Sequence, residues 1–249
     1  MLFLNWFPDT KGDKRLLVCS SFERCFPSEA YFLENIMRVV LVISYVSLLK
    51  EIFPGLDEND SGDLPKWNDE DSPWSILSEG KHGLLSQIID LIGDKEEVII
   101  HPSASIGDFV RIEGPCFIGK NVEIRHSAYI RKGTWICEGA VIGHSSEVKN
   151  SILLPGAKAP HFNYVGDSIL GFESNLGAGA KLSNVRHDKK NIVVTLNDGS
   201  RVKSGLRKFG ALVGDGSKLG CNVVTNPGAI LPALSKIAPN YTVSGWFNT

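Results

Sequence analysis

The chain has 249 residues, 43% of them hydrophobic and 22% charged, and a formal net charge of −2. This is the composition of a globular protein with a sizeable core, and it offers no large basic surface for a nucleic-acid partner. Five cysteines are scattered without a CxxC pair, which argues against a disulfide framework or a zinc ribbon and predicts a reducing, cytoplasmic location. They are Cys19, Cys25, Cys116, Cys137 and Cys221.

Residues 1–56 form an N-terminal extension of unknown role, with a helix predicted from Glu34 to about Ile52. The longest apolar run, Val39–Leu49, contains two serines and is about half as long as a helix that spans a bilayer. We expect a buried helix there, with contact to a membrane surface as the alternative. No cationic leader precedes the run, so we predict neither a targeting segment nor a membrane partner.

Residues 57–97 are expected to link this extension to a domain over residues 98–249. Their first part, DENDSGDLPKWNDEDS over residues 57–72, is acidic and contains Pro and Gly, which predicts a solvated linker. The apolar spacing of residues 83–92 predicts an amphipathic helix. We expect this helix to cap the open end of the following domain, where unpaired strand edges would otherwise invite aggregation.

A six-residue repeat begins at Ile100. Ten successive positions at this spacing hold branched aliphatic residues, namely Ile100, Ile106, Ile112, Ile118, Ile124, Ile130, Ile136, Ile142, Val148 and Leu154. A period of six fits neither an α-helix nor a flat alternating strand. It fits a coil of short strands joined by corners, in which every sixth side chain points inward. The sequence therefore predicts a mainly β protein, a parallel β-helix of stacked coils.

The repeat resembles that of the hexapeptide-repeat, left-handed β-helix family. The resemblance implies three six-residue sides to a coil, so that positions three repeats apart in the sequence stack on adjacent coils. It also implies the left hand, whereas general crossover rules favour the right. The expected fold class is a left-handed parallel β-helix with a partly helical N-terminal extension.

Two segments are expected to leave the coil. The repeat breaks at Pro160, where an anchor is due, and resumes in a new phase at Leu170, which predicts a loop over residues 155–166. A second break, over residues 185–210, contains two β-prone runs around Asn197–Gly199 and predicts a hairpin with an Asp-Gly turn. Repeat proteins tend to build their sites on such excursions.

Two cations are predicted to stack on one side of the coil. Arg131 and Lys149 are three repeats apart, and each follows an anchor. Like charges at the strand spacing repel each other unless a negative group joins them. A phosphate-class anion is one such group. A solvated ladder with Glu113, which lies three repeats before Arg131, is the alternative.

A histidine follows in KAPHFNYVGD, over residues 158–167. Imidazole can act as a general base near neutral pH, although a lone histidine more often only satisfies a local hydrogen bond. His161 comes just beyond the two stacked cations. The small-residue corner SNLGAG, over residues 174–179, would let backbone N–H groups approach a ligand closely.

Residues 124–190 resemble the acetyltransferase domain of the bacterial bifunctional uridyltransferase and glucosamine-1-phosphate acetyltransferase. The segments that carry the resemblance are YIRKG, EVKNS, AKAPHFNYVGDS and NLGAGAKLSN. A closer likeness, over GHSSEVKNSILLPGAKAPHFNYVGDSILG, is to short hexapeptide proteins related to sugar-1-phosphate nucleotidyltransferases. Together these resemblances cover about residues 73–231. The Gly-rich nucleotide-binding segment of the uridyltransferase half has no counterpart near the N-terminus, so that half is not expected.

The resemblance also implies site residues. His161 matches the family's catalytic base. The positions that match sugar-phosphate contacts are Arg131, Lys149, Tyr164, Asn175 and Lys190. The positions that match the surroundings of acetyl-coenzyme A are Ala178, Asn184 and Cys221, the last where the family commonly has a serine. Lys190 is followed by a hairpin that the family lacks, and no metal is expected.

The function that the resemblance implies is acetyl-CoA-dependent N-acetylation of an amino-sugar phosphate, such as glucosamine 1-phosphate. His161 would take a proton from the amine, whose nitrogen would attack the thioester, and N–H groups near Ala178 would stabilise the oxyanion. Arg131 and Lys149 would hold the phosphate. The family is trimeric with sites between subunits, so we expect a homotrimer.

Two other functions stay open. The coil ends soon after Leu231, and an insertion precedes Gly210, so the donor groove could be damaged; the chain would then be a non-catalytic trimeric module that binds a sugar phosphate or a partner enzyme. A metal hydratase is the other alternative, because γ-type carbonic anhydrases share the coil and His126 and His144 are three repeats apart. Against it, the chain has no HxxxxH pair, and His161 is one residue out of step with that row.

Overall fold

The computed structural model describes residues 4–8, 14–18, 37, 45–58, 63–93 and 97–248. The chain divides into two units, residues 1–44 and 45–249. In the first unit, β1 (Leu4–Pro8) and β2 (Lys14–Val18) pair antiparallel. Cys19, Cys25 and most of the predicted helix over residues 34–52 lie outside the described residues, and the part over 45–52 is helical.

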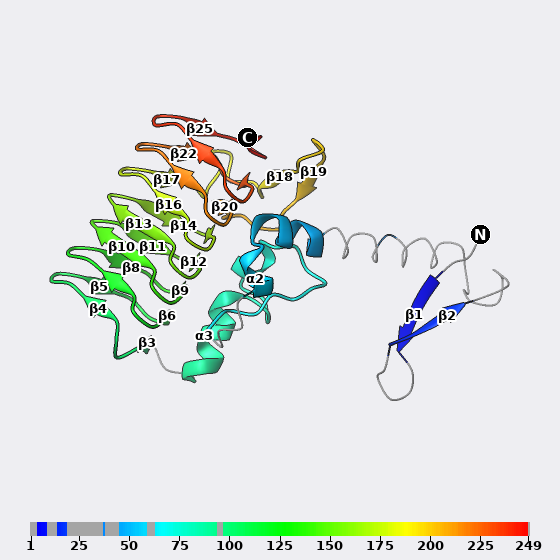
Figure 1. The fold of residues 1–249 in the computed structure, drawn as a ribbon, viewed down its shortest axis with the longest axis horizontal. Helices are drawn as coiled ribbons and strands as arrows, with labels where there is room; N and C mark the ends of the chain where they lie inside the picture. The colour runs from blue at the N-terminus through cyan, green and yellow to red at the C-terminus, as the bar shows by residue number, and fades with distance from the viewer. Residues whose placement is uncertain are drawn as a thin grey trace. The chain divides into compact units, whose positions relative to one another are not determined.

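The second unit is a coil built from three parallel sheets of seven strands each (Figure 1). Sheet I contains β3 (Val98–Ile100), β6 (Cys116–Ile118), β9 (Thr134–Ile136), β12 (Ile152–Leu153), β15 (Ile169–Leu170), β20 (Ala211–Val213) and β23 (Ala229–Leu231). Sheet II contains β4 (Ser105–Ile106), β7 (Glu123–Ile124), β10 (Val141–His144), β13 (Lys158–His161), β16 (Asn175–Leu176), β21 (Lys218–Leu219) and β24 (Lys236–Ile237). Sheet III contains β5 (Arg111–Ile112), β8 (Tyr129–Ile130), β11 (Glu147–Lys149), β14 (Tyr164–Gly166), β17 (Lys181–Leu182), β22 (Val224–Thr225) and β25 (Thr242–Val243). Outside the sheets lie α2 (Gly55–Glu58), the 3-10 turn η2 (Ser75–Leu77), α3 (Leu84–Ile92), β18 (Val193–Thr195) and β19 (Arg201–Lys203).

The repeat anchors fill the interior of the coil. From Ile118 to Val148 every anchor is fully buried, and these side chains form one continuous apolar core. No strand of the coil has more than four residues. The coil is stabilised because each six-residue side buries its anchor side chain in the shared core. At the open first coil, Ile100 and Ile106 remain 43% and 40% exposed. The predicted fold class, a parallel β-helix with a partly helical N-terminal segment, is confirmed.

The coil is continuous through residues 155–166, so the loop predicted there is wrong. β13 and β14 lie in this stretch and pair in register with β10 and β11. The cause is a short corner after Val148, which makes Leu153, and not Leu154, the next inward-facing residue. The coil here is one residue shorter than three full repeats, as the pairing of Lys158 with Val141 shows. A one-residue deletion in the repeat therefore looks like an excursion in the sequence.

The second predicted excursion is a hairpin, as expected. β18 and β19 pair antiparallel across the Asp-Gly turn, where Gly199 has a φ of +79°. An antiparallel bridge between Val185 and Lys208 closes the base of the excursion. Ile192 and Val194 are buried against the outer face of sheet I. The hairpin thus covers part of a side of the coil.

The outer face of sheet I is apolar and covered. Its outward-facing side chains form a second cluster, which includes Trp135, Ile152, Leu154, Ile169, Leu212 and Ile230. Helical residues 45–52, η2 and α3 pack against this cluster and lie along the same side of the coil (Figure 1). Because residues 45–58 belong to this covering layer, the unit boundary falls at residue 45 and not at the predicted residue 56.

Two further predictions about the covering layer are wrong. The acidic stretch is not a solvated linker over its described part, because Leu64 packs on the sheet I cluster and the indole N–H of Trp135 donates to the carbonyl oxygen of Asp63 at 2.9 Å. The predicted helix exists as α3, but its buried Leu84 and Ile88 join the same cluster. It covers a side of the coil rather than its open end, because that side is the larger apolar surface.

A buried carboxylate anchors the covering layer to the coil. Asp215 is 8% exposed, and its two oxygens accept hydrogen bonds from the N–H of Gly55 at 2.8 Å and of Phe172 at 2.9 Å. Its own N–H donates to the carbonyl oxygen of Ile52 at 3.0 Å. Burial raises the pKa of Asp215 to about 6, although the two N–H donors oppose this effect.

We expect Asp215 to make stability depend on pH. Its pKa is higher in the folded chain, so the folded state binds more protons between about pH 4 and 6, and stability falls as the pH rises through this window. The full difference is about 3 kcal/mol by linkage. Denaturant unfolding of wild type and Asp215→Asn between pH 4 and 7 measures it: the variant should lose less stability over the window. Parallel curves for the two proteins would contradict the expectation.

Candidate functional site

His161 ends β13 at the corner between sheets II and III, and its side chain is exposed. Because the coil is short by one residue here, His161 is in register with His144, so the prediction that it is out of step with that row is wrong. A Cβ atom at Gly143 would lie 1.5 Å from the carbonyl oxygen of Pro160. Only glycine allows β13 to pack this closely on β10. The imidazole is thus presented to solvent from the end of a rigid strand.

Ala178 and Cys221 stack on His161 in the following coils. The N–H of Gly179 donates to the carbonyl oxygen of His161 at 2.9 Å, and the N–H of Asn222 donates to that of Ala178 at 2.9 Å. We refer to His161, Ala178 and Cys221 as the His161 column. Ala178 is half-buried and Cys221 is exposed. The column brings the predicted base together with two of the three predicted coenzyme positions.

The corner after β16 leaves a backbone donor next to His161. The N–H groups of Gly177 and Gly179 donate to carbonyl oxygens of adjacent coils, whereas the N–H of Ala178 donates to no residue that the structure describes. A backbone N–H that is fixed in position and has no acceptor within the described chain is suited to stabilise an oxyanion. Asn175, the predicted sugar contact, is half-buried on β16, three residues before Ala178.

Asn163 braces this column, and its role was missed in the sequence. The side chain is buried; its Oδ1 accepts from the N–H of His161 at 3.0 Å, and its Nδ2 donates to the carbonyl oxygens of Gly177 at 2.8 Å and Ala180 at 3.3 Å. One amide therefore ties the coil of His161 to the coil of Ala178. A polar residue directly after a corner, within the distinctive HFNYVGD block, was the available signal.

Arg131 and Lys149 lie side by side on sheet III, as predicted. The register of β8 and β11 aligns them, and the N–H of Arg131 donates to the carbonyl oxygen of the residue before Lys149 at 2.8 Å. Each cation has its own carboxylate: Arg131 pairs with Glu147 at 2.9 Å, and Lys149 pairs with Asp167 at 3.4 Å. Glu113 forms its ion pair with Arg111 at 2.7 Å, and among the described residues no ion pair joins it to Arg131, so the predicted ladder is not formed.

Asp167 is the centre of a polar cluster around Lys149. Its carboxylate is 4% exposed and accepts hydrogen bonds from Lys149, from Asn150 at 2.9 Å and from Asn184. The amide of Asn184 also donates to the hydroxyl of Tyr164 at 3.3 Å. We refer to these five residues as the Lys149 cluster. Asp167 was missed in the sequence, although it lies three repeat lengths after Lys149 and the stacking rule could have identified it.

The ammonium group of Lys149 is only partly compensated by Asp167. Burial lowers the pKa of Lys149, attraction by Asp167 raises it, and repulsion by Lys208 and Arg131 lowers it again, so the pKa is below its usual range. Burial likewise raises the pKa of Tyr164. A surplus of positive charge in a partly buried place favours an anionic ligand.

The His161 column and the Lys149 cluster lie at opposite ends of sheet III. His161 precedes β14, and Gly166, the register partner of Lys149, ends it. The chain turns a corner at Phe162, which has a φ of +52°, and then runs along the three-residue strand β14. Asn184, predicted near the coenzyme, lies in the Lys149 cluster and not in the His161 column. One chain therefore carries the predicted site in two separate groups.

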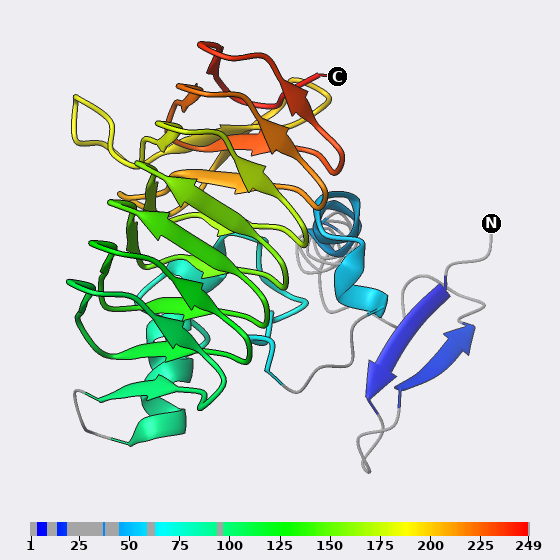
Figure 2. The ribbon, with the colours of Figure 1, turned by 60° about the vertical axis from the view of Figure 1, so that its left-hand side comes forward.

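Lys190 belongs to neither group. It lies in the loop between β17 and β18, which projects from the coil (Figure 2). The side chain is exposed, and its N–H donates to Asp188 at 3.2 Å. No hydrogen bond or ion pair joins Lys190 to either group within the part of the chain that the structure describes.

The histidine row shows no sign of a metal centre. The rings of His126 and His144 stack with their centroids 5.4 Å apart. Among the described residues, no three His, Cys, Asp or Glu side chains gather where they could hold a metal ion. Across the same residues, no helix has the length and hydropathy needed to cross a membrane.

The chain is similar in sequence to known proteins. A bifunctional sugar-1-phosphate nucleotidylyltransferase/acetyltransferase from Sulfurisphaera tokodaii is 38% identical over 186 residues, which cover 72% of this chain and 46% of that protein. The bifunctional protein GlmU of Methanococcus maripaludis strain C5 is 40% identical over 182 residues, which cover 70% of this chain and 44% of that protein. The crystal structure of a putative acetyltransferase from Bacillus cereus is 18% identical, with a TM-score of 0.35, and the match covers 61% of this chain and 75% of that one.

The chain spans less than half the length of these two curated relatives. Residues 112–245 match the family described as the GMPPB C-terminal domain, and this range holds both the His161 column and the Lys149 cluster. More than half of the chain is thereby covered, and the chain belongs to the GMPPB C-terminal domain family.

Proposed function

We propose that the chain is an acetyl-CoA-dependent N-acetyltransferase that acts on an amino-sugar phosphate. The observation that supports this most strongly is the His161 column, in which an exposed imidazole is followed on the next coil by a half-buried Ala178 with an available N–H. The exposed thiol of Cys221 comes on the coil after that. The column therefore places a base, an N–H donor and a thiol on three successive coils, an arrangement that suits an extended thioester.

His161 acts as the general base in this proposal. It accepts a proton from the amine of the sugar as the nitrogen attacks the thioester carbonyl carbon, which gives a tetrahedral intermediate. The N–H of Ala178 donates to the oxyanion. The C–S bond then breaks, the protonated His161 returns the proton to the departing sulfur, and the products are the N-acetylated sugar and coenzyme A. Asn163 acts only as a positioning residue, since it holds the backbone of His161.

The phosphate is held by Arg131 and Lys149 of a neighbouring copy. Within one chain the His161 column and the Lys149 cluster lie at opposite ends of sheet III, and no hydrogen bond or ion pair joins them among the described residues. In a homotrimer, the sheet II–III corner of one subunit can face the sheet III–I corner of the next, which would bring the two groups together. The covered outer face of sheet I leaves sheets II and III as the sides available for this contact.

A thiol-release assay tests the proposal. The purified protein is mixed with acetyl-CoA and either glucosamine 1-phosphate or glucosamine, and free coenzyme A and the acetylated sugar are measured. We expect release of coenzyme A in step with acetylation of the phosphorylated sugar, and far less with the sugar that lacks phosphate. Binding of glucosamine 1-phosphate by calorimetry without any thiol release would instead favour a non-catalytic sugar-phosphate-binding module.

Cys221 is expected to report on coenzyme binding. It is exposed, whereas Cys116 and Cys137 are buried, and burial raises the pKa of Cys116 to about 11 and that of Cys137 still higher. Alkylation mapped by mass spectrometry should therefore modify Cys221 before these two. We expect acetyl-CoA to slow the modification of Cys221 several-fold, with Cys221→Ser as the control for assignment. If saturating acetyl-CoA leaves the alkylation rate unchanged, Cys221 does not lie at the coenzyme site.

A further inference from the structure

A cavity opens beside Lys149, and segments outside the repeat build most of its walls. Its volume is about 590 Å³, and the Lys149 cluster contributes Lys149, Asn150 and Asp167 to one wall. Residues 77–79 of the covering layer and residues 205–208 of the excursion form the others. The amide of Asn150 joins two of these walls, since it donates to the carbonyl oxygen at residue 77 at 3.0 Å and to Asp167 at 2.9 Å.

The cavity carries a surplus of positive charge in a chain whose net charge is −2. Its cationic side chains are Lys132, Lys149, Arg207 and Lys208, and its acidic ones are Glu79 and Asp167. Of the four cations, only Lys149 is paired among the residues that the structure describes. Lys208 is close enough to Lys149 to repel its charge. Four cations and two carboxylates leave a net charge of +2, which suits a ligand with two negative charges, such as the diphosphate bridge of a nucleotide-linked sugar.

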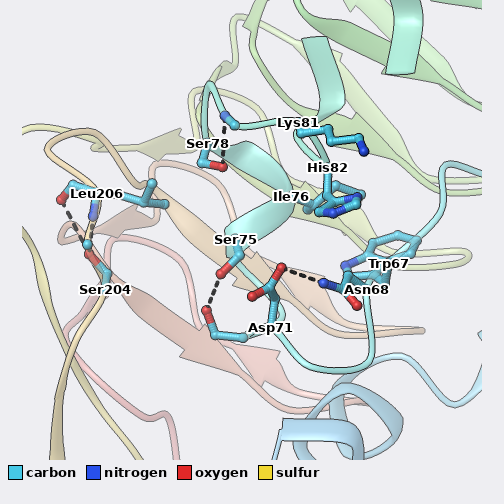
Figure 3. Close-up of a pocket in the computed structure, with 13 residues that line it drawn as sticks. Trp67, Asn68, Asp71, Ser75, Ile76, Ser78, Lys81, His82, Ser204 and Leu206 are labelled. Carbon is cyan, nitrogen blue, oxygen red and sulfur yellow. Dashed lines mark hydrogen bonds between the residues drawn. The ribbon is translucent and has the colours of Figure 1, made fainter. Parts of the chain in front are cut away.

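A second, smaller pocket adjoins the cavity. It has a volume of about 290 Å³, and the two share Ser78, Gly205 and Leu206 in their linings. The rings of Trp67 and His82 both line the smaller pocket (Figure 3). Flat aromatic surfaces suit a nucleobase. The face of any base can stack on them, whichever hydrogen-bonding groups its edge carries.

The smaller pocket is also lined by polar groups. Asp71 and Ser75 line it, and the carboxylate of Asp71 is fixed by the amide of Asn68 at 2.9 Å (Figure 3). A carboxylate is a good acceptor for ribose hydroxyl groups. The cavity beside Lys149 is thus cationic, and the adjoining pocket is polar and aromatic, which suits the diphosphate of a nucleotide in the first and its ribose and base in the second.

We infer that these adjoining cavities bind a nucleoside diphosphate, so that a nucleotide-linked amino sugar is an acceptor in addition to the free sugar phosphate. The inference rests on the proposed function for the amino sugar, but the nucleotide site stands on its own residues. Coenzyme A also contains a nucleoside with a diphosphate. The column that suits its thioester, however, lies at the opposite end of sheet III, so the site is assigned to the acceptor.

Calorimetric titration of the full chain with UDP and with GDP, without acetyl-CoA, tests the inference. We expect at least one of them to bind, and Arg207→Gln combined with Lys208→Gln to weaken that binding by about tenfold or more, since hydrogen bonds to charged groups are strong. The matched control is Arg201→Gln with Lys203→Gln, which removes two exposed charges of β19 that line neither cavity. No binding of either nucleotide, or equal loss in both double variants, would overturn the inference.

Two further titrations separate the parts of the proposal. Trp67→Leu should weaken nucleotide binding but leave the binding of inorganic pyrophosphate unchanged, and equal affinities of wild type for pyrophosphate and nucleotide would overturn the base subsite. Acetyl-CoA should not compete with the nucleotide, and competition would assign the site to the coenzyme instead. Nucleotide binding without thiol release toward any amino sugar would sink the proposed function alone, and thiol release without nucleotide binding would sink this inference alone.

Discussion

His161→Ala is expected to lower kcat for acetyl transfer by about 10²- to 10⁴-fold, the usual contribution of a general base. KM for the sugar phosphate should change little, because the phosphate contacts belong to the Lys149 cluster and not to the His161 column. The fold should survive the change, since the imidazole is exposed and its backbone is held by Asn163. Steady-state kinetics and a thermal unfolding curve of the variant measure the two effects separately.

His144→Ala is the matched control for this variant. His144 is the same residue type in the same register position, one coil earlier; its ring packs against the rings of His126 and Phe162, and its Nδ1 lies 3.0 Å from the carbonyl oxygen of His126. We expect its kcat to stay within a few-fold of wild type. If the two alanine variants lose activity equally, or if His161→Ala retains full activity, His161 is not the base.

Two inactive variants should regain activity when their subunits are mixed. If each site joins His161 of one copy to Arg131 of the next, then in random trimers of His161→Ala and Arg131→Ala about a quarter of the sites carry both wild-type residues. We chose Arg131 rather than Lys149 because its partner, Glu147, is 34% exposed, so removal of Arg131 leaves no buried charge unpaired. Activity after co-refolding, assayed well below KM for the sugar, should approach a quarter of the wild-type value.

Sedimentation of the same mixture supplies the control, since the recovered activity must travel with the trimer. Each variant refolded alone should remain inactive. If the mixture shows only the summed activities of the two variants, one chain holds the whole site. The ligand must then be long enough to reach from His161 to Lys149 along sheet III.

The repeat was readable in the sequence because its physical cause is local. An inward-facing aliphatic side chain at every sixth position, as at Ile118, Ile124 and Ile130, is required whatever surrounds the coil. The stacking of Arg131 and Lys149 follows from the same spacing. What periodicity could not show was a corner shortened by one residue after Val148, because a deletion and an insertion both interrupt the pattern. The error moved His161 out of its row.

The covering layer was misplaced for a different reason. Whether a helix caps the end of a coil or covers its side depends on which apolar surface is free, and this is a tertiary property. The signal was present, since Trp135, Ile152 and Ile169 alternate with the inward-facing residues of sheet I and are themselves apolar. An apolar outer face implies that something covers it. The cavity beside Lys149 follows from that cover and could not have been predicted from the repeat.

The roles of Asn163 and Asp167 were missed because they depend on neighbours in three dimensions. Asn163 satisfies groups in three different coils, and Asp167 gathers donors from Lys149, Asn150 and Asn184. Asp167 lies three repeat lengths after Lys149, whereas Asn163 has no distinctive spacing of its own. Both lie in the HFNYVGD block, so their types could be noted in the sequence but their partners could not.

A crystal structure of the protein with bound coenzyme A tests the central claim most directly. We expect the pantetheine arm to lie along the His161 column, with its thiol next to the N–H of Ala178 and within reach of the imidazole of His161. A coenzyme whose thiol lies away from this column, for example in the cavity beside Lys149, would contradict the account.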